Sequence, residues 1–290
     1  MSRVPLIFGT MTLGAPGQNG VRITELEECQ RILDVYLKAG KEIDTARQYG
    51  NGTTEECLSK LDLTGGVIDT KVFPVQPGGH KAEAFRNTFK TSLEKLSPHK
   101  VRILYLHAPD RSVPFEETLS EAHKLHKEGL FEILGLSNYA AWEVAEIVMI
   151  CRQNNWIQPT VYQGMYNAIT RDCEPELIPC LRKFGMRFVI YNPLAGGFFA
   201  GRVSKPDEEI PEGRFSGDGN MARMYRARYF RSAYFEAMEL IRPIAEKHGL
   251  RLTEIALRWC QHHSLLTPED GVILGASSVS QLEQNINDRV

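Results

Sequence analysis

Four residues that could act together in proton transfer stand at or just after short apolar runs of the sequence: Asp44, Tyr49, Lys71 and His107. A phenol has a pKa near ~10, so Tyr49 is a poor acid at neutral pH unless its surroundings change that value. An ammonium such as that of Lys71 stabilises the phenolate and lowers this pKa, and Asp44 can hold Lys71 charged and in place. His107 can form a hydrogen bond at the same oxygen position. The four residues therefore predict a tyrosine that donates a proton to a carbonyl oxygen as a hydride reaches the carbon.

The segments that would position this group form an alternating pattern of strands and helices. Short, nearly continuous apolar runs, mostly bounded by Gly, Pro, Asn or Asp, are typical of parallel strands covered on both faces. Such runs predict strands at residues 5–9, 41–44, 66–71, 101–107, 132–137, 160–165, 187–192 and 271–274. Segments with a 3.6-residue period predict helices at residues 25–39, 82–96, 114–128, 141–152, 174–184, 233–248 and 253–262. Thr53 and Glu56 have the spacing of a capping box, which predicts the start of a further helix.

Strands that alternate with helices over 290 residues predict an α/β fold, either a closed barrel or a doubly wound sheet. A doubly wound sheet usually has a GxGxxG turn after its first strand, and residues 9–17 do not match that pattern. We therefore predict a single (β/α)8 TIM barrel over residues 1–290, as one domain. Reactive residues of such barrels lie where strands end and the following loops begin, which brings the four residues to one barrel mouth.

Residues 196–232 interrupt this alternation. The segment is rich in Gly, Pro and Arg, and it follows the seventh strand, so it would be a long loop on the catalytic face of a barrel. A loop of this length is usually functional or mobile, and the alternative is a solvated surface insertion. Its arginines are Arg202, Arg214, Arg223, Arg226, Arg228 and Arg231.

The composition is that of an ordinary soluble protein and excludes several classes of partner. The formal net charge is −2, so no broad basic field favours binding of nucleic acid. The six cysteines show no CxxC motif and no histidines at zinc spacing, so we expect reduced structural thiols and no metal. No run approaches the ~20 apolar residues that cross a bilayer, and the apolar part of the amino terminus is too short for a signal peptide. We therefore expect a cytoplasmic protein with no membrane partner.

The residues at the strand ends resemble those of the aldo-keto reductases, especially of the aflatoxin-aldehyde reductase branch, which is succinic semialdehyde reductase-like. The matching stretches are residues 42–50, 69–71, 105–110, 135–139, 162–167, 191–197 and 275–285. They span nearly the whole chain in the family's order. The resemblance implies a (β/α)8 barrel that reduces an aldehyde or ketone to an alcohol with NADPH. It also implies that Tyr49 is the general acid, that Lys71 and Asp44 support it, and that His107 orients the carbonyl.

The resemblance further implies which residues bind NADPH and the substrate. Those for NADPH are Ser137, Asn138 and Gln163 at the nicotinamide carboxamide, Tyr191 on the nicotinamide ring, Asn192, Leu194, Gly196 and Arg202 along the pyrophosphate, Ser277, Ser278 and Gln281 at the adenosine 2′-phosphate, and Gln284 and Asn285 at the adenine. Gly275 would let the backbone approach the cofactor closely. Besides His107, Tyr225 and Arg228 correspond to residues that contact the substrate, and Arg228 could bind a carboxylate. The arginines of residues 202–231 would bind an anionic substrate or the phosphates of NADPH.

Three features depart from the family's pattern. Arg202 stands where relatives commonly have Lys, and Gln284 stands where the family usually has Glu. The chain stops at residue 290, shortly after the adenine motif, whereas relatives continue through a further helix and a C-terminal tail. We expect either a truncated sequence or a shorter wall of the substrate pocket, so the substrate is the least determined property. Members of the branch often form dimers, so a homodimer is a further expectation.

Two other functions are compatible with parts of the pattern. The first is a cofactor-binding regulatory subunit with little turnover, like the barrel that associates with potassium channels, which keeps the same four residues. The second is a hydrolytic barrel with paired carboxylates, for which only Asp44 and Asp69 are candidates. Lys71 beside these carboxylates favours redox chemistry over hydrolysis.

Overall fold

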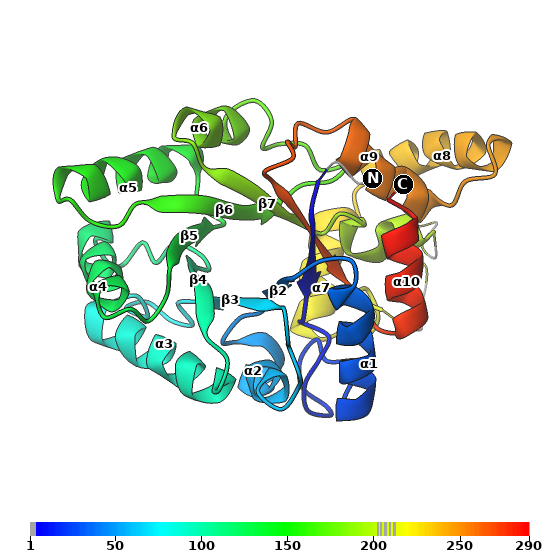
Figure 1. Cartoon of the computed structure of the whole chain (residues 1–290). Coiled ribbons are helices and arrows are strands. Elements are labelled where there is room, and N and C mark those ends of the chain that lie inside the picture. The colour runs from blue at the N-terminus through cyan, green and yellow to red at the C-terminus, as the bar shows by residue number, and fades with distance from the viewer. Residues whose placement is uncertain are drawn as a thin grey trace.

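The computed structural model describes residues 4–289, apart from residues 202, 204, 206, 207, 209, 211 and 212. Parallel strands form a closed barrel in chain order, in which β8 pairs with β1, and helices surround the strands (Figure 1). The strands are β1 (Leu6–Gly9), β2 (Glu42–Asp44), β3 (Val67–Val72), β4 (Val101–Leu106), β5 (Ile133–Ser137), β6 (Pro159–Met165), β7 (Arg187–Tyr191) and β8 (Gly271–Gly275). The predicted (β/α)8 TIM barrel is therefore confirmed.

Helices connect successive strands on the outside of the barrel. They are α1 (Leu26–Leu37), α2 (Thr53–Leu58), α3 (Ala82–Leu96), α4 (Phe115–Lys127), α5 (Ala141–Gln153), α6 (Leu177–Lys183), α7 (Asn220–Tyr229), α8 (Ser232–Lys247), α9 (Leu252–His262) and α10 (Val279–Asn287). Two 3-10 segments, η1 (Tyr49–Gly52) and η2 (Ala195–Ala200), follow β2 and β7. Among the described residues, no helix is long and apolar enough to cross a membrane.

Both faces of the strands are buried, which explains why their sequences read as continuous apolar runs. Phe8 and Leu104 face the surrounding helices, whereas Ile7, Tyr105 and Ile273 fill the interior of the barrel. Burying a large apolar side chain contributes roughly 1.5–3 kcal/mol relative to leaving it exposed. The barrel is therefore a packed core that holds its two rims rigidly in place.

At the amino ends of the strands, the barrel contains a paired layer of charges. Arg102 donates to both carboxylate oxygens of Asp69, at 3.0 and 2.6 Å, and Arg187 donates to both oxygens of Glu42, at 2.7 and 2.9 Å. A second bond from Arg102 reaches Glu42 at 2.5 Å. Buried charges are tolerated when they are paired in this way. Each of these four charges is therefore neutralised by a partner, and none of the four is free to act on a ligand.

The long segment that follows β7 is present, but it is not a loop throughout. It begins with η2, and α7 occupies its second half. Tyr225 and Tyr229, one helical turn apart on α7, stack with ring centroids 6.3 Å apart, and Phe215 lies edge-on to both. Aromatic packing therefore stabilises a helix where the Arg-rich composition predicted none.

Two local expectations are corrected by the structure. The predicted capping box of Thr53 and Glu56 is wrong, because the residue before α2 is Gly52 and no side chain caps this helix. The Thr53 hydroxyl donates to the Gly50 carbonyl at 2.7 Å, and Glu56 pairs with Lys95 at 2.7 Å. The helix α10 was not among the predicted helices, because few of its nine residues are apolar.

The strand register brings predicted site residues to the carboxyl rim of the barrel. Asp44 is the last residue of β2 and stands opposite Asp69 of β3, while Ser137 ends β5 opposite Gln163 of β6. Lys71 follows on β3, two residues beyond Asp69, and its side chain is fully buried. Because parallel strands run in one direction, their carboxyl ends meet at the same rim, as the prediction requires.

Candidate active site

Lys71 and Asp44 form a buried ion pair at the carboxyl rim. Lys71 Nζ lies 2.6 and 2.7 Å from the two Asp44 carboxylate oxygens and donates to the Thr45 carbonyl at 2.7 Å. Gln163 Nε2 donates to the same carboxylate at 2.7 Å. Burial lowers the pKa of Lys71, and the charge of Asp44 opposes that shift. The pair therefore fixes one ammonium group in a site that water does not reach.

Tyr49 lies in the loop after β2, and its ring faces the ammonium of Lys71. The distance from Lys71 Nζ to the ring centroid is 5.0 Å. The sequence predicts that Lys71 lowers the pKa of the phenol, but the net shift in the structure is upward. Burial raises the pKa of Tyr49 well above its ordinary value, and the negative charge of Asp44 adds to the shift. At neutral pH Tyr49 is therefore a protonated phenol.

His107 follows β4 directly and lies beside Tyr49. The two rings meet edge to face with centroids 5.9 Å apart, and the Phe73 ring also packs edge to face with the imidazole, at 5.5 Å between centroids. Burial lowers the pKa of His107 well below its usual value, and Lys71 adds to this effect. Within the described part of the chain, its buried Nδ1 has no hydrogen-bond partner. His107 is therefore a neutral imidazole, which can donate a hydrogen bond to a ligand.

Three of the residues predicted at the nicotinamide lie next to this group. Asn138 Nδ2 donates to the His107 carbonyl at 2.9 Å and to the Ser137 hydroxyl at 3.0 Å. The Tyr191 hydroxyl donates to Asn138 Oδ1 at 2.7 Å. Asn138 has a left-handed backbone, with φ of 64°, which Asn tolerates better than most residues. The ends of β4, β5 and β7 are thus joined through one exposed amide.

The residues predicted along the pyrophosphate lie where β7 leads into η2. Asn192 also has a left-handed backbone, with φ of 58°, and its Oδ1 lies 3.4 Å from the donating Tyr225 hydroxyl. Leu194 is half-buried, and Gly196 has φ of 69°. A Cβ on Gly196 would lie 2.6 Å from the Tyr225 ring, so only glycine fits here. The predicted residue Arg202 lies outside the described residues.

Arg214 is a candidate site residue that the sequence-based assignment did not include. Its Nη1 donates to Asn192 Oδ1 and to the Tyr225 hydroxyl, both at 3.1 Å. A Cβ on Gly275, at the end of β8, would lie 3.4 Å from Arg214 Nη2. Arg228 lies over the same Tyr225 ring, 5.7 Å from its centroid. The guanidinium of Arg214 thus spans the ends of β7 and β8, and its only signal in the sequence was its place in the Arg-rich segment.

The first turn of α10 carries the residues predicted for the adenosine 2′-phosphate. Ser278 is the N-cap of this helix, and its hydroxyl accepts from the Gln281 amide at 3.2 Å. Ser277 is exposed and donates to Gln281 Oε1 from its amide at 2.7 Å and from its hydroxyl at 3.0 Å. A helix amino terminus favours an anion because its backbone N–H groups point outward. Hydroxyl and amide donors therefore meet where a phosphate would lie.

Asn285 provides a test of whether a nucleotide fits this rim. Its side chain is buried, and Nδ2 has no hydrogen-bond partner among the described residues. A buried amide donor without a partner is costly, and a ligand that accepts its hydrogen bond would remove that cost. Gln284 beside it is exposed. The donor set from Asn138 to Asn285 suits the amide, phosphate and base of a dinucleotide.

Comparison with known proteins shows to which family this chain belongs. The sequence profile of the Aldo/keto reductase family matches residues 5–289. The chain belongs to the aldo/keto reductase family. Aflatoxin B1 aldehyde reductase member 2 of Mus musculus is 45% identical over 98% of this chain and 79% of its own length. Aldo-keto reductase family 7 member A3 of Homo sapiens is 44% identical over 98% of this chain and 88% of its own length. Aldo-keto reductase pigE of Monascus ruber is 37% identical over 98% of this chain and 89% of its own length.

Membership in the aldo/keto reductases confirms the resemblance and the reaction class. The protein is therefore an oxidoreductase of this family, whose members use a nicotinamide cofactor. The hydrolytic alternative is wrong, and the structure explains why its two carboxylates do not act as a pair. Asp44 binds Lys71, while Asp69 binds Arg102 in the layer of charges toward the amino ends of the strands.

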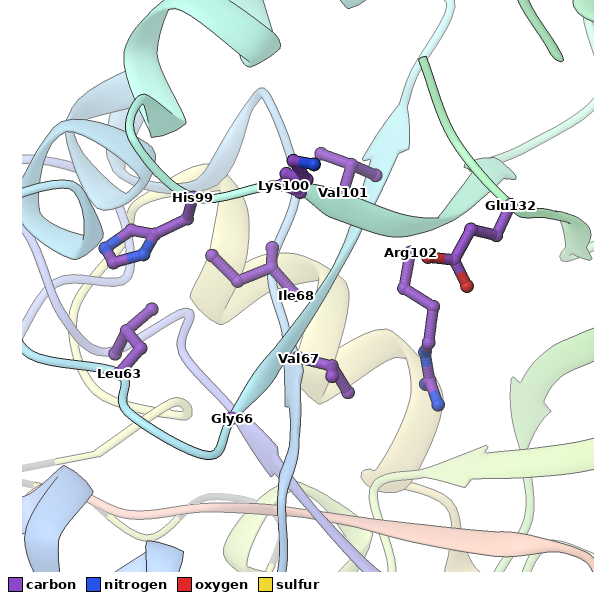
Figure 2. Close-up of a pocket in the computed structure, with 9 residues that line it drawn as sticks. All are labelled: Leu63, Gly66, Val67, Ile68, His99, Lys100, Val101, Arg102 and Glu132. Atoms are coloured by element: carbon purple, nitrogen blue, oxygen red, sulfur yellow. The ribbon is translucent and has the colours of Figure 1, made fainter. Parts of the chain in front are cut away.

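Two hollows of this aldo-keto reductase lie at opposite ends of the barrel. One, of about 210 Å³, lies where β3 and β4 begin, and Figure 2 shows Arg102 and Glu132 on one side of it and Leu63 and His99 on the other. None of its described lining residues belongs to the predicted site. The other, of about 410 Å³, lies between the loops that follow β3 and β4, and Phe73 connects it to His107. The second hollow is therefore the one next to the reactive group.

Proposed function

We propose that this aldo-keto reductase reduces an aldehyde or ketone to an alcohol with NADPH, and that Tyr49 donates the proton. The observation that carries the proposal is the position of the Lys71 ammonium. It is bound by both oxygens of Asp44 and lies 5.0 Å from the Tyr49 ring centroid, and the His107 ring meets the Tyr49 ring edge to face. Relatives named aflatoxin B1 aldehyde reductase support the same reaction class.

The raised pKa of Tyr49 is compatible with an acid role. A protonated phenol keeps its proton in the resting protein and gives it up only as negative charge develops on the carbonyl oxygen. The fixed ammonium of Lys71 then stabilises the phenolate that forms, and it needs no reorganisation because Asp44 already holds it. Interactions that strengthen only as charge develops accelerate the reaction. When bound, the nicotinamide would supply the hydride.

His107 would orient the carbonyl. As a neutral imidazole between Tyr49 and Phe73, it can donate one hydrogen bond to the same oxygen that Tyr49 protonates. The apolar ring of Phe73 limits the directions from which a substrate reaches this oxygen.

The residues that would hold NADPH form a continuous path along the rim. Asn138, Ser137 and Tyr191 would bind at the nicotinamide, where their hydrogen bonds already fix one another. Arg214 would meet the pyrophosphate, because its guanidinium lies between the ends of β7 and β8. Gln163 would also bind at the nicotinamide. Further along, the path comprises Asn192, Leu194, Gly196, Gly275, Ser277, Ser278, Gln281, Gln284 and Asn285. Arg202, which lies outside the described residues, is proposed for the pyrophosphate from the family resemblance alone.

The substrate proposal concerns Tyr225 and Arg228. Tyr225 is buried on α7 between the guanidinium groups of Arg214 and Arg228, which lie 5.2 and 5.7 Å from its ring centroid. If Arg214 binds the cofactor, Arg228 is the guanidinium that can bind a substrate carboxylate. We therefore expect carbonyl compounds that carry a carboxylate, such as succinic semialdehyde, to be better substrates than neutral ones.

A panel of aldehydes and ketones, assayed with NADPH and with NADH, tests the proposed function. We expect NADPH absorbance to fall with succinic semialdehyde and 4-nitrobenzaldehyde, and NADH to be used less well. Fluorescence titration with NADPH provides the control that the protein is folded and binds cofactor. Tight NADPH binding without turnover of any carbonyl compound would contradict the proposal and favour a regulatory subunit.

A further inference from the structure

Glu55 of α2 is a buried carboxylate that lies beside the site without belonging to the proposed catalytic group. Its side chain is 0% exposed. Oε2 accepts a hydrogen bond from Arg47 Nη1, and Oε1 accepts one from the Thr70 hydroxyl at 2.7 Å. Arg47 stands two residues before Tyr49, and Thr70 directly precedes Lys71. Glu55 therefore connects the loop of the acid with the strand of the ammonium.

The loop that contains Tyr49 needs an anchor of this kind. Gly50, Asn51 and Gly52 follow Tyr49 with φ of 54°, 52° and 94°, so three successive residues have left-handed backbones. A Cβ on Gly52 would collide with the guanidinium of Arg47, which shows that this guanidinium lies against the loop backbone. Such a conformation persists only where surrounding contacts impose it. Arg47 supplies one of these contacts.

A backbone hydrogen bond also connects the two segments that Glu55 joins, the loop of Tyr49 and the strand of Lys71. The Arg47 amide donates to the Lys71 carbonyl at 3.0 Å, which extends the pairing of β2 with β3 past the end of β2. The side-chain bridge through Glu55 adds a second connection between the same two segments. Two connections at different points resist rotation as well as separation, which a single hydrogen bond does not.

We propose that Glu55 is a positioning residue for the reaction, which keeps Tyr49 at a fixed distance from Lys71 by binding Arg47 and Thr70 at once. The inference rests on the proposed function, because this distance matters only if the two residues act together. A displacement of about 1 Å at a reacting group can cost roughly 100-fold in rate. A carboxylate that merely stabilised the fold would lack this effect on the rate.

The charge of Glu55 also reaches Lys71. Glu55, Asp44 and Asp69 each raise the pKa of the Lys71 ammonium against the effect of burial. Burial raises the pKa of Glu55, and Arg47 opposes that shift. The carboxylate thus favours the charged form of Lys71 in addition to holding its strand. This electrostatic contribution is smaller than that of Asp44, because Asp44 touches the ammonium directly.

The test is the variant Glu55→Gln, with Thr70→Val and the double variant beside it. Glutamine keeps the size of Glu55, but its amide nitrogen must face one of the two donors. We expect kcat of Glu55→Gln to fall about 10- to 100-fold, whereas the NADPH dissociation constant stays within about twofold, since the cofactor residues lie on other loops. Thr70→Val should lower kcat about threefold or more, and the double variant should be no slower than Glu55→Gln. If Glu55→Gln does not fold, Thr70→Val alone decides the proposal.

The matched control is Asp270→Asn. Asp270 is also 0% exposed and also paired with an arginine, Arg182, but it stands just before β8 at the amino rim. We expect it to lower stability and to leave kcat within about twofold. If the wild type turns over and Glu55→Gln or Thr70→Val has the same kcat, the positioning role is overturned. Absence of turnover in the wild type would instead overturn the proposed function and this role with it.

Discussion

The Lys71 ammonium lies 5.0 Å from the centre of the Tyr49 ring. On its other side the same ammonium is bound by both oxygens of Asp44, at 2.6 and 2.7 Å. Lys71 is fully buried and Asp44 is 3% exposed, so neither charge can exchange its partner for water. The charge that would stabilise a phenolate is therefore set by the fold before any ligand binds.

Replacing Lys71 with methionine should abolish activity and lower stability. Methionine has a similar length, but it leaves the buried carboxylate of Asp44 without its cation. Breaking a buried ion pair from one side costs about 3–5 kcal/mol in the free energy of unfolding. Urea unfolding measures this loss, and NADPH oxidation measures activity.

The double variant Asp44→Asn with Lys71→Met provides the control for this prediction. It removes both charges, so it should recover part of the lost stability while remaining inactive. A Lys71→Met protein as stable as the wild type would show that the ion pair is not buried as described.

The stability of the protein should fall at acidic pH because of His107. Burial and Lys71 hold the pKa of His107 well below its usual value in the folded state, whereas the unfolded chain has a value near ~6.5. As pH falls through that value, the unfolded state binds a proton first, so the folded state loses relative stability. The wild type should therefore lose more unfolding free energy between about pH 7.5 and about pH 5.5 than His107→Gln does. Equal losses in the two proteins would rule out a lowered pKa of His107 in the folded state.

Much of the fold could be predicted from the sequence, because strands buried on both faces leave continuous apolar runs. The predicted strand bounds differ from the observed ones by at most one residue: β4 ends at Leu106 rather than at His107, and β7 ends at Tyr191 rather than at Asn192. These two polar residues lie just past the strands, where the backbone turns. The shift in these strand ends did not change the predicted location of the site at the carboxyl rim.

The parts of the site that could not be predicted depend on contacts between distant segments. Gln163 binds Asp44 across 119 residues of chain, and no local pattern signals such a contact. The pKa of Tyr49 depends on how deeply the folded protein buries it, which outweighs the effect expected from Lys71. The helix α7 depends on the packing of Tyr225 and Tyr229, which the three arginines of its sequence do not signal.

Adjacent glycines in η2 should respond differently to alanine. Gly196 and Gly197 both have positive φ, of 69° and 103°, so each alanine costs about 1 kcal/mol or more through backbone strain. Only at Gly196 would the new Cβ also press on Tyr225, at 2.6 Å, because nothing described lies within 4 Å at Gly197. Gly196→Ala should therefore be the less stable protein and should have the higher KM for a carboxylate-bearing aldehyde. Indistinguishable behaviour of the two variants would contradict the contact with Tyr225.

Replacing Ser277 with alanine should reduce the preference for NADPH. The exposed Ser277 hydroxyl lies just before the N-cap of α10, where a 2′-phosphate would accept its hydrogen bond. Loss of a hydrogen bond to a charged group should raise the NADPH dissociation constant about tenfold or more and leave that of NADH unchanged. The contrasting variant is Ser278→Ala, which removes the N-cap and should cost about 1 kcal/mol of stability. Equal weakening of both cofactors by Ser277→Ala would place the phosphate elsewhere.

The central claim, that Tyr49 is the proton donor, is tested most directly by Tyr49→Phe. The measurement is steady-state NADPH oxidation with succinic semialdehyde, alongside NADPH binding followed by fluorescence. Phenylalanine keeps the ring against Lys71 and His107 and removes only the proton, so binding should be unchanged while kcat falls about 100-fold or more. A Tyr49→Phe enzyme with the wild-type kcat would contradict the account.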